Sequence, residues 1–294
     1  MSVPSPYAPQ LAEIPVRAGE VEVSGSRTAF WTYGEADSTV TVLLVHGFRG
    51  EHHGLEPVLA FLPGMRVIAP DLPGFGESAP FENVEHSTDS YAAWLIEFAR
   101  ALDLGPDLVV IGHSFGSIVS AAAVAAGLPL SRLILINPIA APALTGPRGI
   151  ATRLAVFYFW LGSVLPERAG YALLTNRLIV RVSTGSMIKT KTTALRRWIN
   201  DQHDRYFSVF ASRRVVLESF RASVSSDVST YAASITTPTL LVAADRDDIT
   251  ALPAQYRLQK LFPNARLAVI KGVGHLIHYE KPREAAAAIK DFLS

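Results

Sequence analysis

The fold is decided by residues 107–126, DLVVIGHSFGSIVSAAAVAA. An apolar run ends directly before Gly112-His113-Ser114-Phe115-Gly116, and an alanine-rich run follows it. This order predicts a buried strand, a sharp turn and a helix, which is the setting that a G-x-S-x-G motif requires. A chance match to that motif is expected about 0.1 times in a chain of this length. The two small glycines leave room for a strained turn, so we expect the Ser114 hydroxyl to stand exposed at the end of the strand, beside a helix N-terminus.

The same alternation of strand and helix extends outward from this segment. Nearly continuous β-branched runs are typical of strands that are covered on both faces, and alternating runs are typical of strands with one wetter face. Strands are predicted at 16–23, 28–33, 40–46, 66–69, 108–111, 133–136, 239–242 and 267–270. Helical patterns lie between them at 56–62, 91–102, 117–126, 253–261 and 281–293. The sequence therefore predicts an α/β fold, with a mostly parallel sheet and helices on both of its faces.

The alternation stops between residues 139 and 235, where the pattern is helical without a convincing strand. This stretch carries 13 Lys/Arg and 5 Asp/Glu, a net charge of +8, which leaves −7 for the rest of the chain. We predict a first core part at 1–138, an inserted helical cap at 139–235 and a second core part at 236–294. Ligands of open α/β sheets bind at the carboxyl ends of the strands, so the cap is expected to cover that edge.

Composition excludes several classes of protein. With 49% hydrophobic and 18% charged residues the chain can bury a large core, and a net charge of +1 offers no basic surplus for nucleic acid. The chain has no cysteine, which excludes disulfides, thiolate metal sites and a cysteine nucleophile. The apolar window at 154–165, about 12 residues, is too short to span a bilayer. The first residues show no signal-peptide pattern, so we expect a soluble cytoplasmic protein.

A serine hydroxyl is a poor nucleophile unless a base lies within hydrogen-bond reach and an acid orients that base. The candidate base is His275, which stands between glycines late in the chain, in GVGH after the apolar run LAVI. The candidate acid is one of three aspartates after the run TLLVA: Asp245, Asp247 or Asp248. Asp247 is favoured because a loop can curve there towards a histidine of the next loop, whereas Asp245 could merely cap a turn.

Together these segments resemble the α/β-hydrolase fold family over residues 14–294. The matching segments are LLVHGFRG (43–50), APDLPGFGES (69–78), GHSFG (112–116), LVAADRDD (241–248) and GVGHLIHYEKP (272–282). The resemblance implies an eight-stranded sheet and the order Ser, Asp, His along the chain. It supports Asp247, because the family's acid stands three residues after a small residue, here Ala244. It also implies an oxyanion hole built from the backbone N–H groups of Phe48 and Phe115.

The substrate is indicated less directly. A serine nucleophile disfavours the epoxide hydrolases and dehalogenases of this fold, and Leu276 stands where the family's carbon–carbon bond hydrolases commonly have tryptophan. The cap segment LAVFYFWLGSVL suggests an apolar pocket wall formed by Phe157, Phe159 and Trp160, although the same segment could simply pack the cap onto the core. The basic cap could attract anionic substrates or touch a membrane surface, or only be solvated.

We therefore expect a serine hydrolase that cleaves a carboxylic ester, thioester, lactone or amide of an apolar small molecule. The alternatives are a non-catalytic ligand-binding relative, or a lyase, acyltransferase or carbon–carbon hydrolase with the same three residues. We expect no cofactor. Glu51, His52 and His53 resemble a metal-ligand cluster, but adjacent histidines point apart and no distant partner has a matching spacing, so we expect no metal site.

Overall fold

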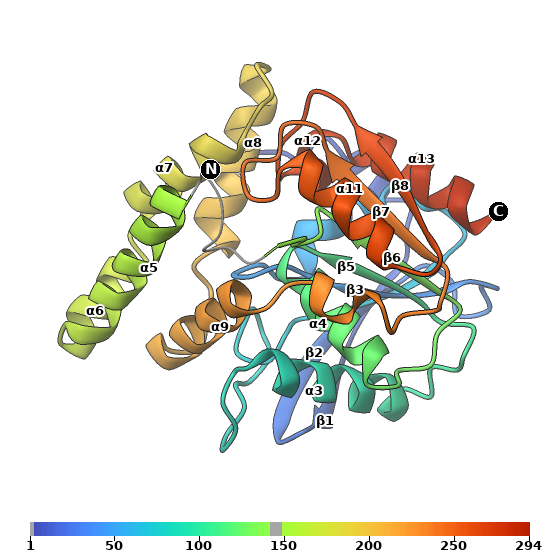
Figure 1. Ribbon diagram of the computed structural model, residues 1–294, viewed down its shortest axis with the longest axis horizontal. Helices are drawn as coiled ribbons and strands as arrows, with labels where there is room; N and C mark the ends of the chain where they lie inside the picture. Colours follow the sequence, from blue (N-terminus) through green and yellow to red (C-terminus); the bar gives the residue numbers. More distant parts are fainter. Residues whose placement is uncertain (1–2, 142–148) are drawn as a thin grey trace.

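The computed structural model describes residues 3–141 and 149–294, and within them eight strands form one sheet (Figure 1). The order of the strands across the sheet is β1-β2-β4-β3-β5-β6-β7-β8. The first two strands run antiparallel to their neighbours, and β3 to β8 are parallel to one another. The strands are β1 (Val16–Val23), β2 (Ser26–Tyr33), β3 (Thr41–Val45), β4 (Arg66–Pro70), β5 (Val109–His113), β6 (Arg132–Ile136), β7 (Thr239–Ala244) and β8 (Ala265–Ile270). The predicted mostly parallel sheet is confirmed.

Helices cover both faces of the sheet because its strands are apolar on both sides. On β3, Leu43 and Val45 join one buried cluster, whereas Val42 and Leu44 join the other. Successive side chains of a strand point to opposite faces, so a continuous apolar run needs two cores. One face is covered by α3 (Thr88–Ala101), α4 (Phe115–Ala125) and α11 (Leu252–Leu261), and the other by α2 (Glu56–Leu59), α12 (Ile277–Glu280) and α13 (Pro282–Leu293). Two short elements complete this part, α1 (Ala8–Leu11) and the 3-10 helix η1 (His52–Leu55).

The chain between β6 and β7 is a helical insertion. Among its described residues, which begin again at 149, there are helices but no strand. They are α5 (Gly149–Val164), α6 (Glu167–Leu174), α7 (Arg177–Met187), α8 (Thr193–Tyr206), α9 (Arg213–Ser225) and α10 (Ser229–Ala232). The helices α5 to α8 stand to one side of the sheet, at the left in Figure 1. The last of the six, α10, packs instead into the core beside α4. The boundaries at 139 and 235 remain a prediction.

No helix within 3–141 or 149–294 combines the length and the hydropathy that a bilayer-crossing segment needs. The longest, α5, has 16 residues.

Candidate active site

Ser114 occupies the turn between β5 and α4, in a conformation that L-residues rarely adopt, with φ 53° and ψ −117°. The backbone is tightly packed on both sides of it. A Cβ atom at Gly112 would lie 2.5 Å from the carbonyl oxygen of Gly116, and one at Gly116 would lie 2.3 Å from the carbonyl oxygen of Val45. Both positions therefore require glycine, which explains the spacing of the motif.

The structure brings together the three side chains that the sequence singles out. The Nε2 atom of His275 lies 2.8 Å from Ser114 Oγ, and its Nδ1 atom lies 2.9 Å from Asp247 Oδ2. The three residues come from the ends of three parallel strands, β5, β7 and β8, which meet at one edge of the sheet. His275 and Asp247 are buried, and Ser114 is partly exposed. A serine, a base and an orienting acid at these distances can support nucleophilic attack.

Asp247 is held as a carboxylate by the groups around it. Burial alone would raise the pKa of its side chain, but the contact with His275 and two backbone amides outweighs burial and holds that pKa below its ordinary value. The amides of Ile249 and Thr250 donate to Oδ1 at 2.7 and 3.2 Å. Asn137 donates its side-chain amide to Oδ2 at 3.0 Å, from a backbone with φ 45° directly after β6. Asn137 is not among the residues predicted from the sequence, although a polar residue at the carboxyl end of a buried strand is a usable signal.

The other two aspartates of this loop bind different groups. Asp245 accepts hydrogen bonds from the backbone amides of Gly272 and Val273, at 2.7 and 3.3 Å. It therefore fastens the loop that carries His275. Asp248 is half exposed and pairs with the ammonium group of Lys189, which comes from the insertion. Asp247 is the one that contacts the imidazole.

The two amides proposed for the oxyanion hole lie on either side of Ser114. Phe115 is the first residue of α4, and the loop after β3 that carries Phe48 passes so close that a Cβ atom at Gly47 would lie 3.1 Å from Ser114 Cβ. Within the described parts of the chain, neither amide donates to another residue. Both can therefore donate to an oxygen bound beside Ser114. Their role remains a prediction.

Arg49, which the sequence analysis did not single out, ties this loop to the insertion. Its guanidinium donates to the carbonyl oxygens of Phe207 and Leu174, at 2.8 and 2.9 Å, and to the hydroxyl of Ser208 at 3.1 Å. Arg49 is buried, and burial lowers the pKa of its guanidinium. Its backbone has φ 60°. Because Phe48 is the preceding residue, these bonds fix the position of the predicted oxyanion donor.

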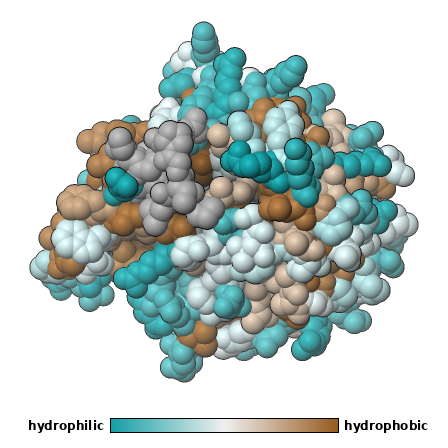
Figure 2. Space-filling model, viewed as in Figure 1, coloured by the Kyte–Doolittle hydropathy of each residue, from teal (hydrophilic) through white to brown (hydrophobic). Residues whose placement is uncertain are grey.

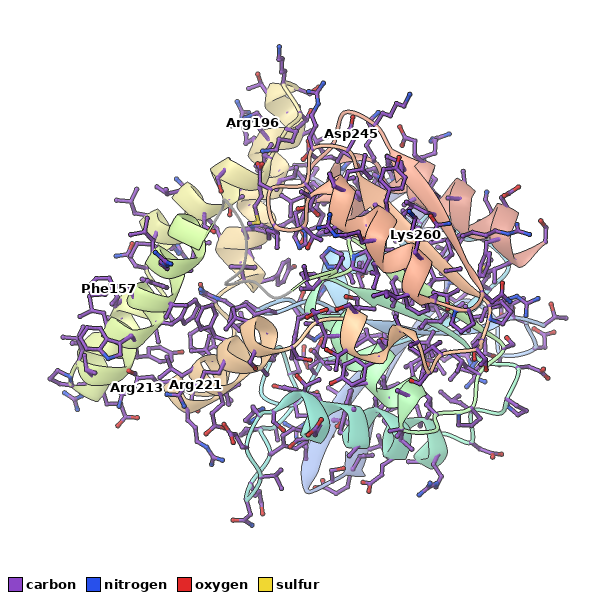
Figure 3. All side chains as sticks on the ribbon, in the orientation of Figure 1. Phe157, Arg196, Arg213, Arg221, Asp245 and Lys260 are labelled. Atoms are coloured by element: carbon purple, nitrogen blue, oxygen red, sulfur yellow. The ribbon has the colours of Figure 1, made fainter. Side chains whose placement is uncertain are left out.

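The three aromatic residues proposed for the pocket wall lie on different sides of α5. Phe159 is buried, stacks on Phe220 of α9 with 3.8 Å between ring centroids, and meets the ring of Phe48 edge-on at 5.8 Å. Phe157 and Trp160 are 56% and 53% exposed and contact each other. Figure 3 shows Phe157 on the outer side of α5, away from the sheet. The structure therefore brings Phe159 next to the candidate site but not the other two.

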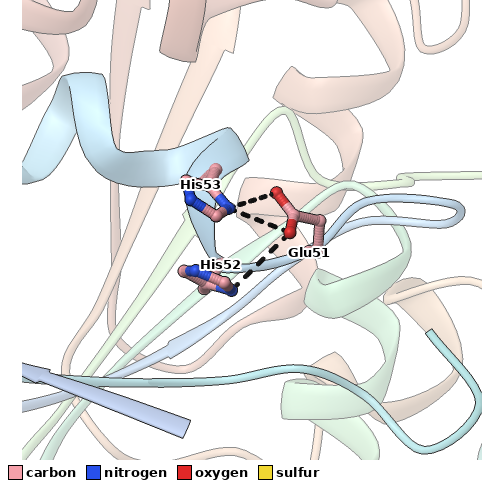
Figure 4. Close-up of side chains that lie close together, drawn as sticks. All are labelled: Glu51, His52 and His53. Atoms are coloured by element: carbon pink, nitrogen blue, oxygen red, sulfur yellow. Dashed lines mark hydrogen bonds and ion pairs between the residues drawn. The ribbon is translucent and has the colours of Figure 1, made fainter. Parts of the chain in front are cut away.

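Glu51, His52 and His53 form a hydrogen-bonded cluster (Figure 4). The rings of His52 and His53 lie beside each other with 3.9 Å between their centroids, so the expectation that these histidines point apart is wrong. The Nδ1 atom of His53 lies 2.8 Å from Glu51 Oε1, and that of His52 lies 2.9 Å from the buried carboxylate of Asp71. Burial alone would raise the pKa of Asp71, but its bonds with His52 outweigh burial and hold that pKa below the ordinary value. The ring of His52 also stacks on Trp31 at 3.3 Å. These bonds engage one ring nitrogen of each histidine with a carboxylate and anchor the loop, which fits a structural network better than a metal site.

Comparison with known proteins identifies the family of the chain. A family model described as "Alpha/beta hydrolase family" matches residues 42–289. Lipase 1 of Psychrobacter immobilis is 25% identical over 268 residues, which cover 86% of this chain and 76% of the lipase. N-formylmaleamate deformylase of Pseudomonas putida is 24% identical over 287 residues, which cover 95% of this chain and 97% of the deformylase. An esterase structure from Exiguobacterium antarcticum matches with a TM-score of 0.75 at 18% identity, over 95% of this chain and 100% of that chain. Since the family model spans most of the sheet and both flanks of the insertion, the chain belongs to the alpha/beta hydrolase family.

Proposed function

We propose that this protein is a serine hydrolase that cleaves a carboxylic ester of an apolar small molecule. The observation that carries the proposal is the unbroken hydrogen-bonded series from Ser114 Oγ through the imidazole of His275 to the carboxylate of Asp247, with heavy-atom distances of 2.8 and 2.9 Å. Such a series is the arrangement that activates a serine hydroxyl at neutral pH.

In the proposed reaction, His275 Nε2 takes the hydroxyl proton as Ser114 Oγ attacks the carbonyl carbon of the ester. Asp247 stabilises the imidazolium that forms, and the amides of Phe48 and Phe115 donate to the carbonyl oxygen as it gains negative charge. The imidazolium then returns the proton to the departing alkoxide, which leaves as the alcohol. Water, deprotonated by His275, cleaves the acyl-enzyme bond and releases the carboxylic acid and the free serine.

The choice of an ester rests on two supports. Lipase 1 of Psychrobacter immobilis is a relative by sequence, and the apolar rings of Phe159 and Phe220 pack on Phe48 of the loop after β3. An amide, thioester or lactone would react through the same steps. The similarity to a deformylase is a reason to assay amides beside esters. Assays of each substrate class therefore identify the bond that is cleaved.

The test combines a fluorophosphonate probe with a panel of p-nitrophenyl esters from acetate to long-chain acyl groups. Stoichiometric labelling of the wild type at Ser114, with turnover of at least one ester, supports the proposal. The matched control is Ser114→Ala, which should not be labelled and should turn over esters at no more than a small residual rate. Labelling of Ser114 without turnover of any ester, lactone, thioester or anilide would contradict the hydrolase and favour a ligand-binding relative.

A further inference from the structure

One face of α5 is apolar and exposed. Leu154, Phe157, Trp160 and Val164 are 65%, 56%, 53% and 55% exposed. Their spacing of three, three and four residues places them along one side of a helix. The opposite side packs inward through Phe159, so α5 has a buried apolar face and an exposed apolar face. An exposed row of this kind, with two large aromatic rings, marks an interaction surface.

The next helices of the insertion also expose apolar side chains. On α7, Leu178 and Val182 are 71% and 69% exposed and lie one turn apart, and on α6 Tyr171 is 38% exposed. Figure 2 shows hydrophobic residues gathered at the end of the molecule that these helices form, at the left of the view. We call the exposed apolar residues of α5 to α7 the apolar end of the insertion.

Basic side chains border the same residues. Over the described residues of α5, α6 and α7, the charged side chains are four arginines and one glutamate, a net charge of +3, and all four arginines are exposed. They are Arg153, Arg168, Arg177 and Arg181, and Arg181 forms an ion pair with Asp204 of α8. Arg153 precedes Phe157 by one helical turn and so lies within the row itself. Aromatic and aliphatic residues with interspersed arginines are typical of helices that lie in the headgroup layer of a membrane.

We propose that the apolar end of the insertion docks on an anionic phospholipid surface. Phe157, Trp160 and Leu178 would enter the boundary between headgroups and acyl chains, where amphipathic rings are favoured. Each arginine near a negatively charged leaflet adds attraction that weakens as salt is raised. This surface is separate from Ser114, so docking does not depend on the proposed ester hydrolysis.

The charges favour lipid over a second copy of this chain. A two-fold dimer would place the same patch on both sides of the interface. The arginines of each copy would then face those of the other, with Arg153 in the centre of the apolar row, and like charges across an interface are costly. An anionic lipid surface supplies the opposite charge and accepts the apolar side chains in the same contact.

Docking would also bring lipid close to the candidate site. Phe159, on the inner side of α5, contacts Phe48 of the loop beside Ser114. The exposed row lies on the outer side of the same helix, so one helix diameter, about 10 Å, separates the lipid from these rings.

The test is co-sedimentation of the full chain with vesicles of phosphatidylcholine alone and of phosphatidylcholine with phosphatidylglycerol. The wild type should bind the anionic vesicles and bind less as salt is raised. The double variant Phe157→Ser/Trp160→Ser should bind them at least about tenfold more weakly, since burial of even one such ring is worth more than that factor. The matched control is Tyr256→Ser on α11, an aromatic residue that is 49% exposed and lies outside the insertion, and it should bind as the wild type does.

A charge-reversal pair separates the electrostatic part of the contact. Arg153→Glu/Arg177→Glu should weaken binding to anionic vesicles, whereas Arg257→Glu, exposed on α11, should not. Far-ultraviolet circular dichroism and the melting temperature show that each variant is folded. Equal binding by the wild type and the double aromatic variant would overturn the proposal. So would a concentration-dependent dimer in sedimentation velocity that the aromatic variant abolishes, because it would assign the patch to a second copy.

Discussion

At the scale of single residues, the site depends on which side chain touches His275. Ser114 and Asp247 bind the two ring nitrogens, and the neighbouring aspartates bind other groups. Each contact therefore has its own expected consequence when it is removed.

Ser114→Ala is expected to abolish ester hydrolysis while the protein stays folded. The substitution removes the atom that would form the acyl-enzyme bond, so turnover should fall by many orders of magnitude and leave only a small residual rate. The measurement is kcat/KM for the best ester of the panel, with circular dichroism as the control for folding. Turnover close to that of the wild type in the purified variant would remove Ser114 from the proposed mechanism.

Asp247→Asn is expected to reduce kcat far more than Asp245→Asn. An amide at 247 cannot stabilise the imidazolium and favours the wrong tautomer, an effect that reaches about 10⁴ in related arrangements. Asp245 holds the amides of Gly272 and Val273 rather than the imidazole, so its replacement should cost much less. The two variants, assayed with the same ester, are matched in chemistry and differ only in position. A larger loss at 245 would mean that the wrong aspartate has been assigned.

Much of the site could be predicted from the sequence, because its signals are local. The glycines around Ser114 and the short loop that carries His275 each impose a conformation by themselves. The contacts that were missed, Asn137 to Asp247 and Arg49 to the insertion, join residues more than one hundred positions apart. Ser114, Asp247 and His275 are also far apart, but family motifs mark each of them, whereas no such motif marks Asn137 or Arg49 as a partner.

At the scale of elements, the strands were predicted well and the orientation of α5 was not. A buried strand between two helical layers needs a run of apolar residues, so the inner strands are visible as such runs, whereas β1 and β2 are visible as alternating runs. Helix α5 is apolar on nearly every side, so its periodicity does not say which side faces the core. Its packing decides instead: a Cβ atom at Gly162 would lie 2.8 Å from Leu174 Cδ2, and this close approach, with the stack of Phe159 on Phe220, fixes the inner face.

Phe159→Ala is expected to change the preference of the enzyme among acyl chain lengths, whereas Phe157→Ala is not. The first substitution opens space beside Phe48, near the candidate oxyanion donor, and the second removes a ring that faces outward. Loss of apolar contact with the bound ester should raise KM more than it lowers kcat. The readout is KM across the p-nitrophenyl ester panel, with fluorophosphonate labelling as the control for an intact nucleophile. An identical effect of the two variants on KM would mean that the inner face of α5 does not contact the substrate.

At the scale of the whole molecule, the described residues include five buried histidines whose pKa values burial lowers. They are His46, His86, His113, His203 and His278. Burial lowers the pKa of His86 and of His203 to about 4, and that of His113 to about 3. An unfolded chain protonates its histidines near their ordinary pKa of about 6.5. Unfolding below that pH therefore takes up protons that the folded chain does not bind.

The free energy of unfolding is accordingly expected to fall as the pH drops from about 7 to about 5. A histidine whose pKa is lowered on folding stabilises the folded state fully above its pKa in the unfolded chain. Below that pH the stabilisation is lost, at about 1.4 kcal/mol per pH unit for each histidine. Urea unfolding at several pH values in this range measures the slope. A free energy of unfolding that stays constant over the range would contradict the assignment of these histidines as neutral and buried.

The strained backbone conformations at the sheet edge are expected to lower the melting temperature. Ser114, Arg49 and Asn137 all have positive φ, and such conformations cost of order 1–3 kcal/mol each where the residue is not glycine. Ser114→Gly relieves that cost at one position. The opposing term is the roughly 0.5–1 kcal/mol that a glycine backbone, which is freer in the unfolded chain, loses on folding. Ser114→Ala removes the same hydroxyl but keeps the Cβ atom, so the glycine variant should melt above it, by up to about 5 °C. The reactive serine thus lowers the melting temperature of the fold. An inactive protein with glycine at this turn would stay folded at temperatures that unfold the active one.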